Sequence, residues 1–513
     1  MPRRVSGLLA RASLLVGTGA GGLAAPAILL ALVAGPARAD TLQDALVNAY
    51  ETNPSIEQAR ADLRAQDAQV PLERSFGMPQ VSADATLTEY LRQAQASFTN
   101  PERQLSAGID LAVPLYQGGG VRNAIRAAEE RVTASRADLR STESVIFAQV
   151  TAAYMDVIQN EAIVGLSANN VEVLTTNLQA TSDRFEIGDL TRTDVAQSES
   201  RLALARSDLR EAEAALVGAR ERYVQLVGAA PIDLQPPPPL PNLPELVEDA
   251  VAYAVENNPD LVGAIERAEA AGFDIRVVTA GRLPRLEAYT SGSYNNYLGT
   301  LGSLPGTADP EQINTAAQAG LRLTVPLFQG GRVAAQRRQA QAVASAALEG
   351  VVVVERDVIQ QVRSAFTNWR ASNAVIASSQ TAVEAAELSL EGVRAENTVG
   401  NRTVLDILDA QRELLISQVD LVTARRNAYV AAFTLLAAMG RAEARDLGLA
   451  DELQLYDPTV NYDRVRGNIW DWSNDPNPTV QTRSTVDIPA QDGSISEEQR
   501  LQTVQPVQPV QPI

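Results

Sequence analysis

The sequence predicts a mainly α-helical protein with a smaller membrane β part, built from two copies of one structural unit. Three observations predict this fold class. The chain resembles itself at a spacing of about 210 residues. In each half, a long proline-free stretch carries apolar residues at every seventh position, and two shorter stretches alternate apolar with polar residues.

The internal repeat is clearest at two short motifs. Asn53-Pro54 in the first half corresponds to Asn258-Pro259 in the second, and "VPLYQGG" at residues 113–119 corresponds to "VPLFQGG" at residues 325–331. Beyond these motifs the two halves match without a gap for more than a hundred residues. A gapless match of that length predicts rigid elements whose lengths are fixed.

The repeat divides the chain into five parts. Residues 1–39 are expected to form a secretory signal, because two early arginines precede an apolar core and a small-residue cleavage site. Residues 40–230 and 245–456 are the two repeats. Residues 231–244 are proline-rich and predict an extended spacer, whereas residues 457–513 have low complexity and are expected to be disordered.

The composition removes most kinds of enzyme chemistry. The 513 residues include neither histidine nor cysteine, so zinc and iron–sulfur ligation, disulfides, thiol nucleophiles and the usual general base are all excluded. We therefore expect no cofactor, no metal and no enzymatic activity. The 43 basic residues are outnumbered by 62 acidic ones, and a net charge of -19 makes nucleic acid a poor partner.

The proline-free stretches predict two long helices. In the first half this stretch covers residues 120–185, and its heptad of apolar residues is typical of a coiled-coil seam. At 1.5 Å per residue, a helix of about 63 residues spans roughly 95 Å. Helices expected at residues 42–75 and 189–227 together match this length, so we predict that they stack end to end beside the long helix.

Four stretches with period-two alternation predict β-strands. Strands of about ten residues with one apolar face and aromatic residues near their ends are typical of outer-membrane barrels. Tyr116 and Phe328 stand where two of the strands end, which makes them candidate interfacial aromatics. The four stretches are residues 80–90, 104–116, 285–297 and 317–328.

Four strands leave two open edges, which a membrane does not tolerate. Lipid offers no hydrogen bonds to an exposed sheet edge, so closure requires further copies of the chain. Two copies supply eight strands and three supply twelve. The strand count alone leaves both possibilities open.

Glycine pairs follow two of the strands, and two readings of them are possible. Gly118 and Gly119, like Gly330 and Gly331, could suggest a phosphate-binding loop, but the required Lys-Ser/Thr and its spacing are missing. We predict instead that these glycines are hinges where each strand turns into a long helix.

The doubled "VPL(Y/F)QGG", the paired Asn-Pro motifs and the run "VGNRTVLDILDAQREL" resemble the TolC family of outer-membrane efflux ducts. The resemblance covers about residues 41–456. It implies a homotrimer whose twelve-stranded barrel, with four strands per chain, lies in outer-membrane lipid of a Gram-negative bacterium. It also implies a long periplasmic α-helical coiled-coil barrel, a periplasmic adaptor (membrane fusion) protein and an inner-membrane ABC or RND transporter as partners.

The same resemblance implies which residues form the channel entrance. Gly188 and Gly400 match the tips of two helical hairpins, and Asp406 and Asp409 match aspartates that ring a narrow opening. A ring of carboxylates favours cations. The alternative reading is that the two aspartates are solvated residues near a helix amino terminus, where carboxylates suit the helix dipole.

A latch at the entrance is also implied. Arg402 matches an arginine that holds the entrance shut, and Thr193 and Asp194 match its partners on the neighbouring hairpin. Where the best-known family member has a tyrosine in this latch, the chain has Asn397, so we expect a latch that is weaker or differently connected.

Two classes of cargo fit such a duct: proteins in type I secretion, or small toxic molecules in multidrug efflux. The stretch "LYDPTVNYDRVRGNIWDW" is similar to the tail of family members in type I secretion, which favours protein cargo. The rival from another class is a periplasmic coiled-coil structural protein without a pore.

Overall fold

The computed structural model describes residues 40–92, 100–302, 306, 308–449, 453–497 and 499. The predicted signal at residues 1–39 lies outside this part of the chain. Within it, no helix combines the length and the apolar character needed to cross a membrane.

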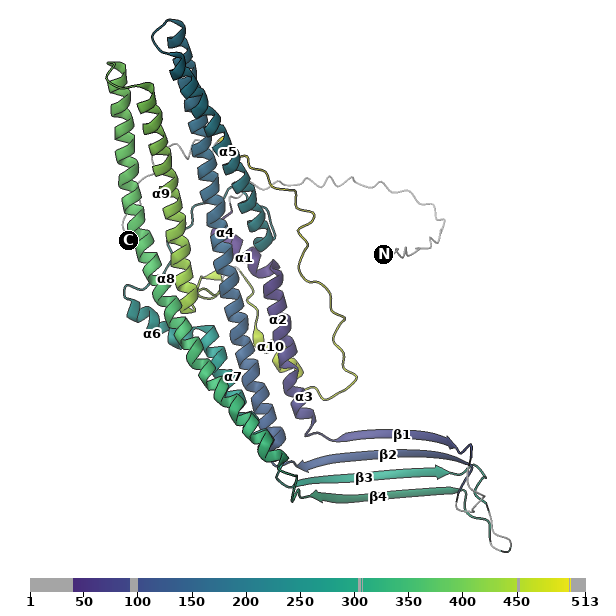
Figure 1. Ribbon diagram of the computed structural model, residues 1–513. Helices are drawn as coiled ribbons and strands as arrows, with labels where there is room; N and C mark the ends of the chain where they lie inside the picture. Colours follow the sequence, from purple (N-terminus) through teal and green to yellow (C-terminus); the bar gives the residue numbers. More distant parts are fainter. Residues whose placement is uncertain are drawn as a thin grey trace, which may run out of the picture. The chain divides into compact units, whose positions relative to one another are not determined.

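Both halves contain the same order of elements (Figure 1). The first half consists of α1 (Leu42–Thr52), α2 (Pro54–Asp67), α3 (Gln69–Ser75), β1 (Gln80–Glu89), β2 (Arg103–Tyr116), α4 (Gly120–Glu186) and α5 (Arg192–Val227). The second consists of α6 (Val247–Asn257), α7 (Pro259–Ala280), β3 (Arg285–Asn296), β4 (Ile313–Thr324), α8 (Arg332–Thr398) and α9 (Val404–Met439). A short helix, α10 (Pro458–Val465), follows.

The long helices have identical lengths in the two halves. α4 and α8 each contain 67 residues, and α5 and α9 each contain 36. A 67-residue helix is about 100 Å long. Each long helix starts after a glycine pair in the left-handed region, with φ of 79° at both Gly119 and Gly331. A side chain at Gly118, where φ is 65°, would also approach Leu283 to 2.8 Å, so glycine is required at that turn.

The single helix expected at residues 42–75 is wrong, because the structure divides it into α1, α2 and α3. Asn53 has a non-helical backbone, and its side chain accepts a hydrogen bond from Ser55 N at 2.9 Å. Pro54 follows at the first position of α2, where its missing N–H costs nothing. The Asn53 amide also donates to Leu226 O at 2.9 Å, which ties this joint to the end of α5.

The second Asn-Pro motif makes the same joint. Asn258 caps α7 by accepting from Asp260 N at 2.9 Å and donates to Ala438 O near the end of α9, also at 2.9 Å. In each half the Asn-Pro motif therefore lies where the end of one shorter helix, α5 or α9, meets the start of another, α2 or α7, beside the long helix. That arrangement agrees with the expectation from the helix lengths.

The four strands form one antiparallel sheet in the order β1-β2-β3-β4. β1 pairs with β2 through partners such as Ala83 and Ile109, and β3 pairs with β4 through partners such as Ala288 and Leu321. The fourth strand spans Ile313–Thr324, a few residues earlier than expected. Proline cannot donate a ladder hydrogen bond, so Pro326 is consistent with the early end.

The largest apolar core lies where α1, α4 and α5 meet, and the linker between the halves packs onto it. Tyr154 of α4 is fully buried, and its hydroxyl donates to Asp40 O at 2.9 Å and to Gln235 O at 2.7 Å. Leu234 of the linker is buried as well. The linker was expected to be a plain spacer, but it is fastened to the core by side chains far away in the sequence.

The expectation of disorder for residues 457–513 does not hold for Pro458–Val465, which form α10. Asp457 caps α10 by accepting from Thr459 N at 2.8 Å, and Tyr462 packs against the buried Val70 of α3. Farther along, Arg220 of α5 donates to Ser494 O at 3.0 Å. The sequence of the tail does not reveal these partners in α3 and α5.

Candidate functional site

The two hairpin tips are built alike. Gly188 between α4 and α5 has φ of 84°, and Gly400 between α8 and α9 has φ of 80°. Each glycine N–H donates back to the preceding helix, to Phe185 O at 2.9 Å and to Asn397 O at 3.0 Å. Both lie in the tight turns that the sequence assigned to them, because only glycine reverses the chain at positive φ without strain.

The predicted entrance residues Asp194 and Asp406 occupy equivalent positions at the starts of α5 and α9. Each is the third residue of a capping box. Asp194 accepts from Thr191 N at 2.9 Å, and Asp406 accepts from Thr403 N at 2.8 Å. The threonine hydrogen bonds lower the pKa of both carboxyls below their ordinary value. Both side chains are therefore ionised and held at a helix amino terminus, as the alternative reading proposed.

Arg402 does not contact Thr193 or Asp194 within the chain. Its Nε donates to Glu396 at 2.7 Å, and its Nη1 lies 3.8 Å from Asp406. The hydrogen bond with Glu396 raises the pKa of this arginine above its already high value. The predicted latch is thus not formed inside one chain.

Asn397, which departs from the family pattern, shapes the loop itself. Its amide donates to Arg402 O at 2.7 Å across the tip. This bond fixes the backbone that carries the Arg402 side chain. Asn397 therefore closes its own loop.

The second predicted ring residue, Asp409, pairs with a residue that the sequence did not single out. Arg201 of α5 donates to Asp409 of α9 at 2.5 Å. Asp409 is about half exposed and Arg201 about one quarter exposed. The pair joins the two hairpins and places a positive charge beside an entrance carboxylate. The only sequence signal for it is that Arg201 lies seven residues after Asp194, on the same face of α5.

An apolar cluster binds the same part of the two hairpins together. Leu408, two residues after Asp406, is buried in it, and Gln411 accepts from the Asn177 amide of α4 at 3.0 Å. The motif "LDILDAQ" therefore has two faces, since its aspartates are exposed or half-exposed whereas Leu408 and Gln411 are buried. The buried members of the cluster are Leu174, Leu202, Ala205 and Leu408.

The predicted interfacial aromatics lie at the end of the sheet that is next to the helices, where β1 begins and β2 and β4 end. Tyr116 is 51 % exposed and Phe328 is 89 % exposed. Phe76, which precedes β1, is exposed to the same degree as Tyr116, and the Gln117 amide donates to its carbonyl at 3.0 Å. Sequence reasoning missed Phe76, although its distance from β1 mirrors that of Phe328 from β4.

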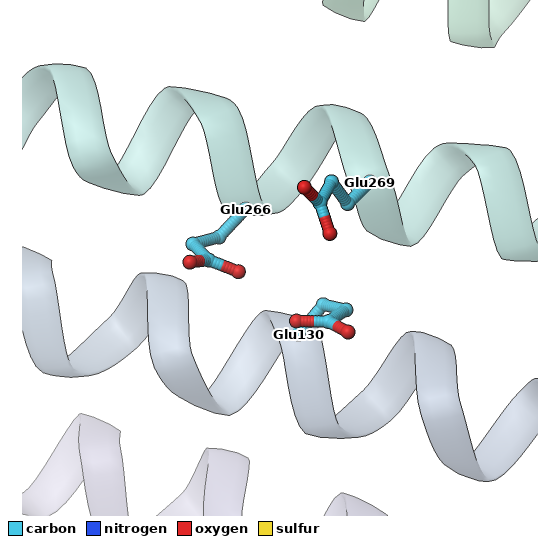
Figure 2. A group of neighbouring side chains, drawn as sticks. All are labelled: Glu130, Glu266 and Glu269. Atoms are coloured by element: carbon cyan, nitrogen blue, oxygen red, sulfur yellow. The ribbon is translucent and has the colours of Figure 1, made fainter.

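A separate acidic cluster joins α4 to α7. Figure 2 shows Glu266 and Glu269 of α7 pointing toward Glu130 of α4, and one oxygen of each lies within 4.8 Å of the others. Burial and the nearby Glu130 raise the pKa of Glu266 to about 7. Such a group can share a proton or attract a cation, but a cluster of carboxylates without another feature does not define a metal site.

Comparison with known proteins places the chain in a family. The family model described as outer membrane efflux protein matches residues 45–229 and 251–441, which are most of both repeats. The chain belongs to the outer membrane efflux protein family. The one break in the match contains the proline-rich linker, and the match ends just after α9, so the shared part is the repeat itself.

The outer membrane efflux protein BepC of Brucella suis is 34 % identical over 447 residues, covering 86 % of this chain and 95 % of BepC. The outer membrane protein TolC of Escherichia coli is 27 % identical over 423 residues, covering 80 % and 84 %. Among solved structures, the outer membrane channel CmeC of Campylobacter jejuni superposes with a TM-score of 0.67 at 15 % identity, covering 83 % and 89 %.

These similarities settle the general nature of the protein. It is an outer-membrane efflux channel of the TolC family and not an enzyme, as the sequence predicted. They also contradict the rival interpretation of a periplasmic structural protein without a pore.

Proposed function

We propose that the protein is a homotrimeric, passive exit duct that works with a periplasmic adaptor protein and an inner-membrane ABC or RND transporter. The observation that carries the oligomer is the open sheet, because β1 and β4 have no further partner strand among the described residues. Lipid does not satisfy open edges, so other copies must close the sheet. Three copies give twelve strands, which leave room for a lumen.

The long helix α8 supports the same assembly. It exposes several large apolar side chains along its length, and exposed apolar groups of this number indicate a contact surface. Neighbouring copies packing side by side would cover many of these side chains and continue the helical part as a tube. The exposed residues are Val343, Leu348, Val352, Val353, Val375 and Leu388.

The hairpin tips supply the gate in this proposal. A threefold axis brings together three copies of Asp406 and Asp409, which makes six carboxylates around the entrance. Because Arg402 has no contact with Thr193 or Asp194 inside the chain, the latch must join neighbouring copies. Opening then requires that the latch and the Arg201–Asp409 ion pair near the tips break together.

For the cargo, we propose protein in type I secretion, which the likeness of the tail around "NYDRVRGNIWDW" to secretion members supports. Small molecules are the second candidate, because the similar protein BepC carries the name of an efflux protein. Deletion of the gene separates the two. Loss of secreted proteins from the medium supports the first, and increased drug susceptibility with an unchanged secreted proteome supports the second.

The duct itself is tested by electrical recording. Mature protein added to a planar lipid bilayer should produce discrete conductance steps, and its mass in detergent should be three times that of the chain. A preparation that stays monomeric and gives no conductance steps would overturn the proposal.

A further inference from the structure

One exposed apolar feature is not used by the duct. After α10 the chain makes a short turn, residues 468–473, called here the tryptophan turn. Ile469 is 73 % exposed, Trp470 70 % and Trp472 81 %. The whole chain contains only three tryptophans, so two of them stand uncovered within three residues of one another. Exposed large apolar groups of this kind indicate a contact surface.

The tryptophan turn is held in a fixed shape. Ser473 N donates to Trp470 O at 3.0 Å, and Trp470 N donates to Asn468 Oδ1 at 3.1 Å. Arg464 of α10 forms a two-pronged ion pair with Asp475, with N–O distances of 2.6 and 2.9 Å. The pair closes the segment into a loop, so the tryptophans are presented by a structured element.

This loop is anchored next to the place where the sheet begins. Arg74, in the last turn of α3, donates to Arg466 O at 3.1 Å. α3 ends at Ser75 and β1 starts at Gln80, so only four residues separate the anchoring helix from the first membrane strand. Figure 1 shows α10 lying beside α2 and near α3, above the sheet in that view.

The neighbouring end of the sheet carries the aromatic residues described above. Phe76, Tyr116 and Phe328 are all exposed there, at the end of the strands from which the helices continue. Aromatic side chains with a polar edge gather at the boundary between headgroups and acyl chains. Trp470 and Trp472 therefore extend an aromatic level that the strands themselves define.

Both arginines near the tryptophan turn are paired with aspartates. Arg464 is paired with Asp475 and Arg466 with Asp463, the latter at 3.2 Å. Asp471 between the two tryptophans adds one negative charge. A basic patch that would seek anionic headgroups is absent from this described loop, so contact with a membrane must rest on the aromatic and aliphatic side chains.

We propose that the tryptophan turn is an interfacial anchor, with Ile469, Trp470 and Trp472 inserted at the headgroup level of the periplasmic leaflet of the outer membrane. The proposal rests on the placement of the sheet in that membrane. Its occupant is lipid, because the turn continues the aromatic level of the strands and lacks a charged partner surface. The tail would then brace the helical part against the membrane from outside the lumen.

Tryptophan fluorescence tests the anchor on the full mature chain in lipid vesicles. The Trp369→Phe variant leaves only the two tail tryptophans, so all of the emission comes from the turn. In vesicles whose lipids carry bromine near the headgroup, we expect about a twofold loss of emission, and a smaller loss when bromine lies near the chain end, because tryptophan prefers the headgroup level.

The matched control carries Trp470→Phe with Trp472→Phe and keeps Trp369. That residue packs on Phe366 with ring centroids 5.8 Å apart. It lies about 55 Å along α8 from the helix start, so brominated lipid should leave its emission unchanged. Because both arginines of the loop are paired with aspartates, quenching of the tail tryptophans should not increase when anionic lipid is added.

Conductance measured on the same preparation separates the two proposals. Channels together with unquenched tail tryptophans would overturn the anchor while leaving the duct intact. If those tryptophans were also shielded from a water-soluble quencher, the turn would dock on a second copy instead of lipid. Absence of channels would overturn the duct and the anchor with it.

Discussion

The helices α4 and α8 have the same length and equivalent places in the two repeats, yet their surroundings differ. Twenty-one residues of α4 are buried, including Phe147, Val150 and Tyr154, whereas only seven residues of α8 are. α4 runs through the core between α2, α5 and α7, while α8 presents one side to the outside of the chain. The repeat therefore fixed the length and the first residue of each long helix. The difference in burial shows that α8 has the more exposed surface, which other copies of the chain would cover.

The hairpin tips show a second contrast between the repeats. Both keep the glycine turn and the threonine–aspartate capping box, because each tip needs the same reversal of the chain. Only the second tip carries Arg402 and Asp409. The equivalent positions of the first are Leu190 and Gln197. Arg201 of the first hairpin pairs with Asp409 of the second.

The contrast between α4 and α8 is tested most strongly by placing a charge on the exposed surface of α8. Val353→Asp, at a side chain that is 57 % exposed in the single chain, should abolish the trimer because a carboxylate would be buried between copies. Size-exclusion chromatography in detergent measures this. Gln361→Asp, at an exposed polar position about a quarter turn away around the same helix, is the control and should keep the trimer. Equal behaviour of both variants would contradict a helix–helix interface through Val353.

The difference between the two tips predicts the next effect. Asp406→Ala combined with Asp409→Ala should lower the preference for cations over anions by roughly threefold and weaken block by a trivalent cation, because the carboxylate ring disappears. Reversal potentials across a salt gradient measure this. Thr403→Ala removes the capping threonine of the second tip but keeps both carboxylates, so it separates loss of the cap from loss of the ring. Selectivity that does not change in the double variant would count against the ring.

Arg201 offers a further test of the difference between the two hairpin tips. Arg201→Gln should raise cation preference by about twofold, because Asp409 loses the charge that balances it. Arg206→Gln, an exposed arginine farther along α5, is the control. If Arg201 acts through Asp409, its substitution should have a smaller effect when Asp409→Asn is already present. An equal effect in both backgrounds would show that Arg201 acts only through its own charge.

The smallest effect is expected at Glu143 of α4, the more buried of the two long helices. Burial, followed by Glu443, raises the pKa of Glu143 to about 7, although Arg60 and Arg445 oppose this and Ala444 N donates to its carboxylate. Since the folded pKa exceeds the unfolded one, the stability gained is full below about pH 4.5 and is lost as the pH rises toward 7. The loss is at most about 3 kcal/mol.

Thermal unfolding followed by circular dichroism at several pH values measures this dependence. Glu143→Gln should flatten the profile between about pH 4.5 and 7, since the amide cannot titrate. Gln149→Asn, at an exposed position of the same helix, changes no titrating group and should keep the slope. A slope that persists in Glu143→Gln would assign the pH dependence to other carboxyls.

Local patterns in the sequence were sufficient to predict much of the fold. The heptads located α4 and α8 and the alternation located the four strands, whereas the tips at Gly188 and Gly400 were expected from the family resemblance. Each of these features is decided by residues close together in the chain. The aspartates of "LDILDAQ" were also found, although their capping and pairing were not.

Other features were decided only by tertiary contacts. The division of residues 42–75 needs the end of α5 to accept from Asn53, and the contacts of the tail need α3 and α5. Arg201 meets Asp409 only because Leu202 and Leu408 pack the two hairpins together. The sequence by itself determined element lengths, turns and the repeat, because these follow from periodicity and backbone geometry. Tertiary contacts between residues that are hundreds of positions apart decided which charged side chains form ion pairs and which long helix remains exposed.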